Sequence, residues 1–233
     1  MASAFKAKMV EATGDEDAIV VYQKFKSKDE EFSQQLQAII DSGVSTVFLP
    51  GDTGDVANIL KQAKKMGMDQ VTFLGGNGWS SDEFMDKAGK YVSGNVAFST
   101  LYTENEAVTA TSRELSDAYK KKYGEEKTLE AATALGFDAY LLTLRAIESA
   151  GAGATGAQVR DALAATENFQ GASGDITFDN YGDPQKSVVI NTINNKRINP
   201  ICTIEPYEQG PVKKSDKSDK KEKKKEKKNG TED

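Results

Sequence analysis

Residues 44–78 read VSTVFLPGDTGDVANILKQAKKMGMDQVTFLGGNG, a helical pattern between two strand-like runs. The runs are Val44–Leu49 and Val71–Leu74, and glycine or proline follows each of them. Between them, apolar residues recur at helical spacing from Gly54 to Met66, and Gly67 follows at the position where glycine ends many helices. A strand, a helix and a second strand at this spacing predict a right-handed crossover between parallel strands.

The same alternation extends from this unit in both directions. We expect helices at Asp29–Asp41, Ser81–Ala88, Glu106–Tyr123, Leu129–Ser149 and Val159–Leu163, and strands at Ala18–Tyr22, Asn95–Phe98, Ile176–Phe178, Val188–Ile190 and Ile201–Ile204. This order predicts an α/β protein with a Rossmann-like parallel sheet flanked by helices.

The composition excludes several kinds of chemistry. The 233 residues contain no histidine and a single cysteine, Cys202. Nucleophilic catalysis with a histidine base, histidine-ligated zinc and an internal disulfide are therefore excluded. No apolar run approaches the roughly 20 residues of a membrane span. Residues 1–6 also lack the basic start and apolar stretch of a secretory signal. We predict no catalytic residues, no metal site and no cofactor.

The charge is unevenly distributed along the chain. Residues 213–233 contain ten lysines and six acidic residues, so the overall net charge of −6 leaves about −10 on residues 1–212. The segment 208–233 has almost no apolar side chains to bury, and we predict a disordered, lysine-rich tail. Nucleic-acid binding is disfavoured, because acidic residues are interspersed with the lysines and no aromatic residue is present to stack on bases.

The predicted strand-end loops carry the candidate binding residues. Open parallel sheets bind ligands at the carboxyl ends of their strands, where this sequence has Asp52 and Thr53 in one loop and Asn77 and Trp79 in the next. Asp52, Thr53 and Asn77 would contact a small polar ligand, and Trp79 would form an apolar wall. The alternative is that Asp52 and Thr53 only begin a helix and that the glycine-rich loop is only a tight turn.

Two further motifs point to turns rather than sites. Gly151, Gly153 and Gly156 match G-x-G-x-x-G, but a predicted helix precedes them where a dinucleotide site needs a strand. Asp179 and Asp183 resemble a carboxylate pair, yet their spacing does not fit an EF-hand. We interpret the first as a loop between helices and the second as a turn after a strand.

Several segments, taken in order, resemble the branched-chain amino-acid (Leu/Ile/Val) binding proteins, which are type I extracytoplasmic solute-binding components of ABC transporters. The similarity runs from about Phe5 to Pro206. The segments that carry it are KDEEFSQQL at Lys28–Leu36, VFLPG at Val47–Gly51, ILKQAK at Ile59–Lys64, FLGGNGW at Phe73–Trp79 and FDNYGD at Phe178–Asp183.

The resemblance implies two Rossmann-like lobes that close on a ligand like a hinge. Against that plan, the chain is expected to be truncated at its N-terminus, with an incomplete first lobe and without the strand that precedes the first helix. Residues 1–122 would be most of the second lobe. Residues 123–207 would be the returning segment of the first lobe with its crossover strands.

The resemblance also implies a function and a site. It implies capture of a small ligand, an amino acid, outside the cytoplasmic membrane and delivery to an ABC-transporter permease. Relatives commonly carry an acidic residue at the position of Asn77, where it pairs with the ligand ammonium, and many carry an aromatic residue at the position of Asp52. Asn77 cannot supply a charge-assisted bond, so our hypothesis is that Asp52 has taken over this role.

Two alternatives remain open at this point. A ligand-sensing receptor domain of the same fold would require a membrane segment, and the sequence shows none. A flavodoxin-like α/β enzyme would need a phosphate loop or a convergent acid and base at the strand ends. There, Asp52 has neither a histidine nor a glycine fingerprint beside it.

Overall fold

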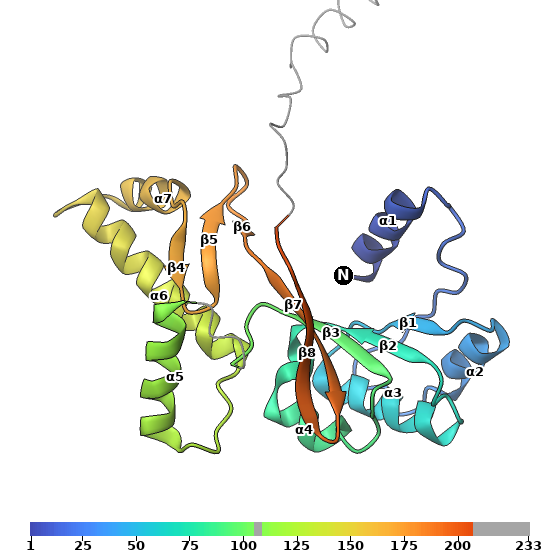
Figure 1. Cartoon of the computed structure of the whole chain (residues 1–233). Coiled ribbons are helices and arrows are strands. Elements are labelled where there is room, and N and C mark those ends of the chain that lie inside the picture. The colour runs from blue at the N-terminus through green and yellow to red at the C-terminus, as the bar shows by residue number, and fades with distance from the viewer. Residues whose placement is uncertain (105–108, 207–233) are drawn as a thin grey trace, which may run out of the picture.

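The computed structural model describes residues 1–104 and 109–206 and contains two groups of elements. The first is a five-stranded sheet in the order β1-β2-β3-β7-β8 with helices α1 to α4 around it, and the second combines helices α5 to α7 with the three-stranded sheet β4-β5-β6 (Figure 1). The predicted tail, 208–233, lies outside the described residues.

The first sheet contains the predicted parallel crossover. Strands β1 (Thr46–Phe48), β2 (Thr72–Gly75) and β3 (Val96–Thr100) pair in parallel, with Val47 opposite Phe73. They are joined by α3 (Thr53–Lys65), and by the 3₁₀ turn η1 (Asn77–Ser80) with α4 (Asp82–Ala88). The α/β class and the parallel sheet are confirmed.

Two later strands extend this sheet beyond β3 with antiparallel pairing. β7 (Val188–Asn194) pairs with β3 antiparallel, and β8 (Arg197–Ile204) pairs with β7. Both were predicted as strands at Val188–Ile190 and Ile201–Ile204, and each is longer in the structure. The chain therefore returns to its first sheet after building the second group of elements.

Apolar side chains of α2 (Ser33–Asp41), α3 and α4 form the core beneath the sheet, on the lower side in Figure 1. α3 buries one continuous face, as its periodicity predicts. The largest fully buried side chains of this core are Phe32, Leu36, Val56, Phe73, Phe84, Val96, Phe98 and Ile193.

Two predictions near the N-terminus are wrong in their details. Ala18–Tyr22 forms no strand, because within the described residues β1 pairs only with β2. The helix expected from Asp29 begins at Ser33, because Lys26 and Asp29 form a hydrogen-bonded turn before it and the Glu31 carboxylate accepts from the backbone N–H of Ser33. The N-terminal helix, α1 (Ala2–Thr13), has no buried residue.

The second group of elements is helical, with a small antiparallel sheet. α5 (Ala110–Tyr123) and α6 (Ala131–Ala150) begin later than predicted, and residues 105–108 of the α5 prediction lie outside the described residues. β4 (Phe169–Gly171), β5 (Gly174–Phe178) and β6 (Pro184–Gln185) form the sheet. β5 confirms the strand predicted at Ile176–Phe178.

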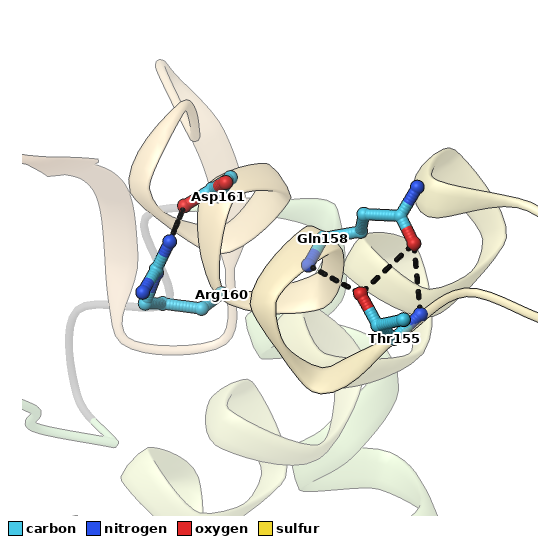
Figure 2. A network of polar contacts seen from close by, with 4 residues as sticks. All are labelled: Thr155, Gln158, Arg160 and Asp161. Carbon is cyan, nitrogen blue, oxygen red and sulfur yellow. Dashed lines mark hydrogen bonds and ion pairs between the residues drawn. The ribbon is translucent and has the colours of Figure 1, made fainter.

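The glycine-rich segment forms a loop over residues 151–155, between α6 and α7 (Gly156–Ala164), as predicted. Thr155 begins α7 with a reciprocal pair of hydrogen bonds, in which Thr155 Oγ1 accepts from Gln158 N and Gln158 Oε1 accepts from Thr155 N (Figure 2). A capping box of this kind fixes where a helix starts. The loop therefore serves to connect two helices. A helix, α6, precedes it, where a dinucleotide site needs a strand.

The close contact between Trp79 and Gly75 leads to a prediction about the stability of a variant. A Cβ on Gly75 would lie 2.2 Å from the indole ring of Trp79, which is only 2% exposed. We expect Gly75→Ala to lower the free energy of unfolding by about 1–3 kcal/mol, the usual cost of overpacking a core. Urea denaturation followed by circular dichroism measures the change.

The matched control is Gly54→Ala in α3, where a Cβ would meet nothing within 4 Å. Since alanine is the better helix former, this variant should be as stable as the parent or slightly more stable. Equal stability of Gly75→Ala and the parent would contradict the prediction.

Candidate functional site

The structure brings the two predicted strand-end loops together. The backbone N–H of Leu49 donates to the carbonyl oxygen of Leu74 at 2.8 Å, so β1 and β2 end side by side. A Cβ built on Gly78 would lie 3.8 Å from Thr53 Oγ1, which places the 50–53 loop next to the 76–79 loop. The parallel register therefore assembles one polar surface from segments about 25 residues apart in sequence.

Asp52 presents an unused carboxylate on this surface. It is the N-cap residue of α3, but its side chain makes no capping hydrogen bond, and the residue is exposed. Within the described residues no donor or cation contacts its oxygens. By contrast, Asp55 in the first turn of α3 accepts a hydrogen bond from the backbone N–H of Lys28 at 3.0 Å, so its carboxylate has a structural contact. The backbone of Asp52 begins the helix, while its carboxylate charge remains available to a ligand.

Asn77 has a partner on the neighbouring strand. Its Oδ1 lies 2.7 Å from Thr100 Oγ1, at the end of β3, and the same hydroxyl lies 2.9 Å from the carbonyl oxygen of Tyr102. Thr100 is 1% exposed, so this contact is anchored in the interior. The Asn77 side chain therefore has a fixed position, and its amide Nδ2 remains without a partner in the described part of the chain.

Trp79 lies beneath the loop rather than on its surface. Its ring is buried and stacks on Phe84 with centroids 5.0 Å apart and an interplanar angle of 13°, and it also packs near Phe98. The indole thus supports the loop from the core side. Its contact with a ligand remains a prediction, as do the binding roles of Asp52, Thr53 and Asn77.

A cavity of about 400 Å³ lies beside Thr100, at a place that no sequence pattern predicts. Tyr102 and Asn191 line it, and their buried Oη and Oδ1 atoms have no hydrogen-bond partner among the described residues. Burial raises the pKa of Tyr102 to about 12 against an opposing effect of the Ser112 side chain, with a smaller contribution from Glu104, so the phenol stays protonated at neutral pH. The sequence does contain a signal for Asn191. It is a polar residue that alternates with Val189 and Ile193 on the buried face of β7.

A second buried polar cluster joins α6 to the β4–β5 turn. Asp138, 1% exposed, accepts hydrogen bonds from the backbone N–H groups of Ala172 and Ser173 and from the Ser173 hydroxyl. Lys186 Nζ donates to the same hydroxyl oxygen, and burial lowers the pKa of Lys186 against the opposing attraction of Asp138.

A serine beside a lysine can be a nucleophile, but this one is not placed to act as one. The Ser173 hydroxyl already donates to Asp138, the residue is 5% exposed, and it does not line the cavity beside Thr100. A Cβ on Gly171 would lie 2.6 Å from Asp138 Oδ1. The cluster therefore ties the turn to α6.

Two absences apply to residues 1–104 and 109–206. No group of three histidine, cysteine, aspartate or glutamate side chains is placed to hold a metal ion. No helix in these segments combines the length and the apolar character needed to cross a membrane.

Comparisons with known proteins agree on one family. The sequence profile of the family described as periplasmic binding protein matches residues 1–197. The leucine-, isoleucine-, valine-, threonine- and alanine-binding protein of Pseudomonas aeruginosa is 27% identical over 165 residues, which are 71% of this chain and 42% of that protein.

Two solved structures are similar to this chain in both sequence and fold. The leucine-binding protein LivK from Thermotoga maritima is 34% identical with a TM-score of 0.73, over 78% of this chain and 51% of that chain. LivJ from Streptococcus pneumoniae, the substrate-binding protein of a branched-chain amino acid transporter solved with isoleucine, is 26% identical with a TM-score of 0.68 over the same shares. This chain spans about half the length of these relatives.

The buried Lys186 predicts a pH dependence of stability. Because its pKa is lower in the folded than in the unfolded chain, folding releases a proton between the lowered value and the ordinary lysine pKa of about 10.5. Stability contributed by this group therefore rises with pH in that window and falls as the pH drops through it. We expect Lys186→Met to remove this rise.

The measurement is the free energy of urea unfolding from about pH 8 to about pH 10, below the ordinary lysine pKa. The control is Lys87→Met, an exposed lysine paired with Glu83 on α4. Parent and control should show the same slope and Lys186→Met a smaller one. Equal slopes in all three proteins would contradict the assignment.

Proposed function

We propose that this chain, which belongs to the periplasmic binding protein family, captures an amino acid outside the cytoplasmic membrane and presents it to the permease of an ABC transporter. The family and the relatives found are binding proteins, so the proposed activity is recognition without covalent chemistry. On this proposal residues 1–122 supply most of the second lobe, and residues 123–207 supply the returning part of the first lobe.

The unpaired carboxylate of Asp52 carries the proposal. It lies exposed at the strand-end edge, next to the loop of Asn77, and nothing in the described residues neutralises it. An α-ammonium group is the cationic part of an amino acid, and its hydrogen bond to a carboxylate is about twice as strong as one to a neutral amide. Asn77 is neutral and its Oδ1 already contacts Thr100, so Asp52 is the better ammonium partner.

The proposed mechanism is selection of a closed state. A ligand that touches both lobes stabilises the closed arrangement by its extra contacts there, and a lobe rotation of this kind is hinge closure. In this chain, Asp52, Thr53 and Asn77 would provide the contacts of one lobe.

Thermal unfolding with a panel of amino acids tests the proposal. A ligand at about 100 times its dissociation constant adds about 2.7 kcal/mol to the stability of the folded protein, which is a rise of a few degrees in Tm for a domain of this size. We expect leucine, isoleucine or valine to raise Tm. A cooperative transition that no amino acid moves would contradict the proposal.

The role of Asp52 makes a sharper prediction. The parent should bind leucine more tightly than 4-methylpentanoate, which is leucine without its ammonium group. Asp52→Asn should lose about tenfold or more in leucine affinity, because one charge-assisted hydrogen bond becomes neutral. Isothermal titration calorimetry measures both ligands on both proteins.

Asp86→Asn is the matched control, because Asp86 is an exposed aspartate on α4 without a partner among the described residues. It changes the net charge equally and should leave both affinities unchanged. Asp52→Asn with the affinity of the parent would refute the ammonium role while leaving amino-acid capture itself intact.

A further inference from the structure

The cavity of about 400 Å³ beside Thr100 is distinct from the candidate site at the strand-end loops. None of the four residues of that site lines it, and its volume falls in the range of about 300–1,000 Å³ that small-molecule sites occupy. Its walls come from both groups of elements, since α4, β7 and β8 contribute from the first and the start of α6 from the second. A molecule bound here would touch both groups.

The side chain of Asn191 points from the sheet into this cavity. Asn191 and Ile193 are two residues apart in β7 and share a face of the sheet, and Ile193 is opposite Ile198 of β8, which lines the cavity. Thr100, another lining residue, comes two residues after Phe98, the partner of Asn191 in β3. Because residues opposite one another in a ladder also share a face, the cavity lies over the Asn191 face of the sheet.

Two buried polar atoms of the cavity walls have no partner. Asn191 is 0% exposed, and its Oδ1 accepts no hydrogen bond within the described residues, while its Nδ2 lies 3.5 Å from the carbonyl oxygen of Val189. The protonated phenol of Tyr102 is likewise buried and has a donor to offer. Buried polar groups are rarely left unpaired. The interior of the cavity therefore calls for an uncharged group that both donates and accepts a hydrogen bond.

Charges of both signs lie at the exposed end of the cavity. Lys196 and Arg197 are exposed where the β7–β8 turn leads into β8, and neither forms an ion pair within residues 1–104 and 109–206. Asp82 is exposed on the first turn of α4, and the Glu130 carboxylate accepts from its backbone N–H at 3.0 Å. Opposite charges at one rim match the ammonium and carboxylate groups of an amino acid.

We propose that this cavity is a second ligand site, which binds an amino acid with an uncharged carboxamide side chain. The carboxamide N–H would donate to Asn191 Oδ1, and its carbonyl oxygen would accept from Tyr102 Oη. The ammonium and carboxylate groups would stay at the rim, near Asp82 and Arg197. An apolar side chain would leave both buried atoms unpaired, and a charged one would have to be desolvated without a counter-ion.

Isothermal titration calorimetry with glutamine and glutamate tests the site. The two ligands have the same length and differ only at the end of the side chain. We expect glutamine to bind saturably and glutamate to bind about tenfold or more weakly, because its side-chain carboxylate carries a charge and has no donor for Asn191 Oδ1. Equal affinities of the parent protein for the two ligands would overturn the proposal.

Variants locate the binding in the cavity. Asn191→Leu removes the acceptor and keeps a side chain of similar size, so it should bind glutamine about tenfold or more weakly than the parent. The matched control is Asn199→Leu, an exposed asparagine of β8 that does not line the cavity, and it should bind as the parent does. Asp52→Asn should also keep the glutamine affinity of the parent.

A second variant covers the case in which Asn191→Leu does not fold, as judged by circular dichroism. Arg197→Gln changes an exposed side chain at the rim and should weaken glutamine binding about fivefold or more, because a hydrogen bond to a charged group is lost. An unchanged affinity in a folded Asn191→Leu, or in Arg197→Gln where that variant replaces it, would contradict the site.

Two further results would overturn the proposal and leave the strand-end site to be judged separately. If no protein of the series binds glutamine, the cavity contains only water, while the leucine titrations still decide the role of Asp52. If glutamine binding is lost in Asp52→Asn and kept in Asn191→Leu, glutamine binds at the strand-end loops and not in the cavity.

Discussion

The parallel ladder of β1, β2 and β3 is the constraint on which the rest of the structure depends. It sets Val47 opposite Phe73 and Phe73 opposite Val96, so these apolar side chains enter one core. A slip of one residue would turn each strand's buried face outward. The same register brings the loops after β1 and β2 to one edge, and the site exists only because the strands end together.

Two buried polar contacts then fix loops that the strand pairing alone does not position. Thr100 holds Asn77 from the end of β3, and Asp138 holds the β4–β5 turn against α6. In each case a side chain that is distant in sequence forms hydrogen bonds with the loop. This arrangement has a consequence for charge: the loop held by Thr100 carries the neutral Asn77, and the negative charge lies on the exposed Asp52 in the neighbouring loop.

Most of the first sheet could be predicted from the sequence, because its elements are read from local periodicity. The α3 pattern, the capping serine Ser81 and the three parallel strands all needed only neighbouring residues. Residues 18–22 show the limit, because a run with β character becomes a strand only when a partner edge is present. Periodicity cannot report that absence.

The candidate site was predictable in its position and less so in its detail. Strand-end loops identify Asp52 and Asn77, but no pattern reveals that Thr100 bonds to Asn77 or that Trp79 faces the core. Tyr102 and Asn191 meet beside Thr100 although nearly 90 residues separate them in the chain. Such a meeting depends on the return of β7 to β3, which is a long-range event.

Trp79 also gives the protein an optical reporter of its own. It is the only tryptophan in the 233 residues, and its buried indole lies against Phe84 directly below the loop of Asn77. All indole fluorescence therefore comes from one known position, between the core and the candidate binding surface. Its emission will respond to water entry when the core opens and to any rearrangement of the 76–79 loop, so folding and ligand contact can be followed without an attached dye.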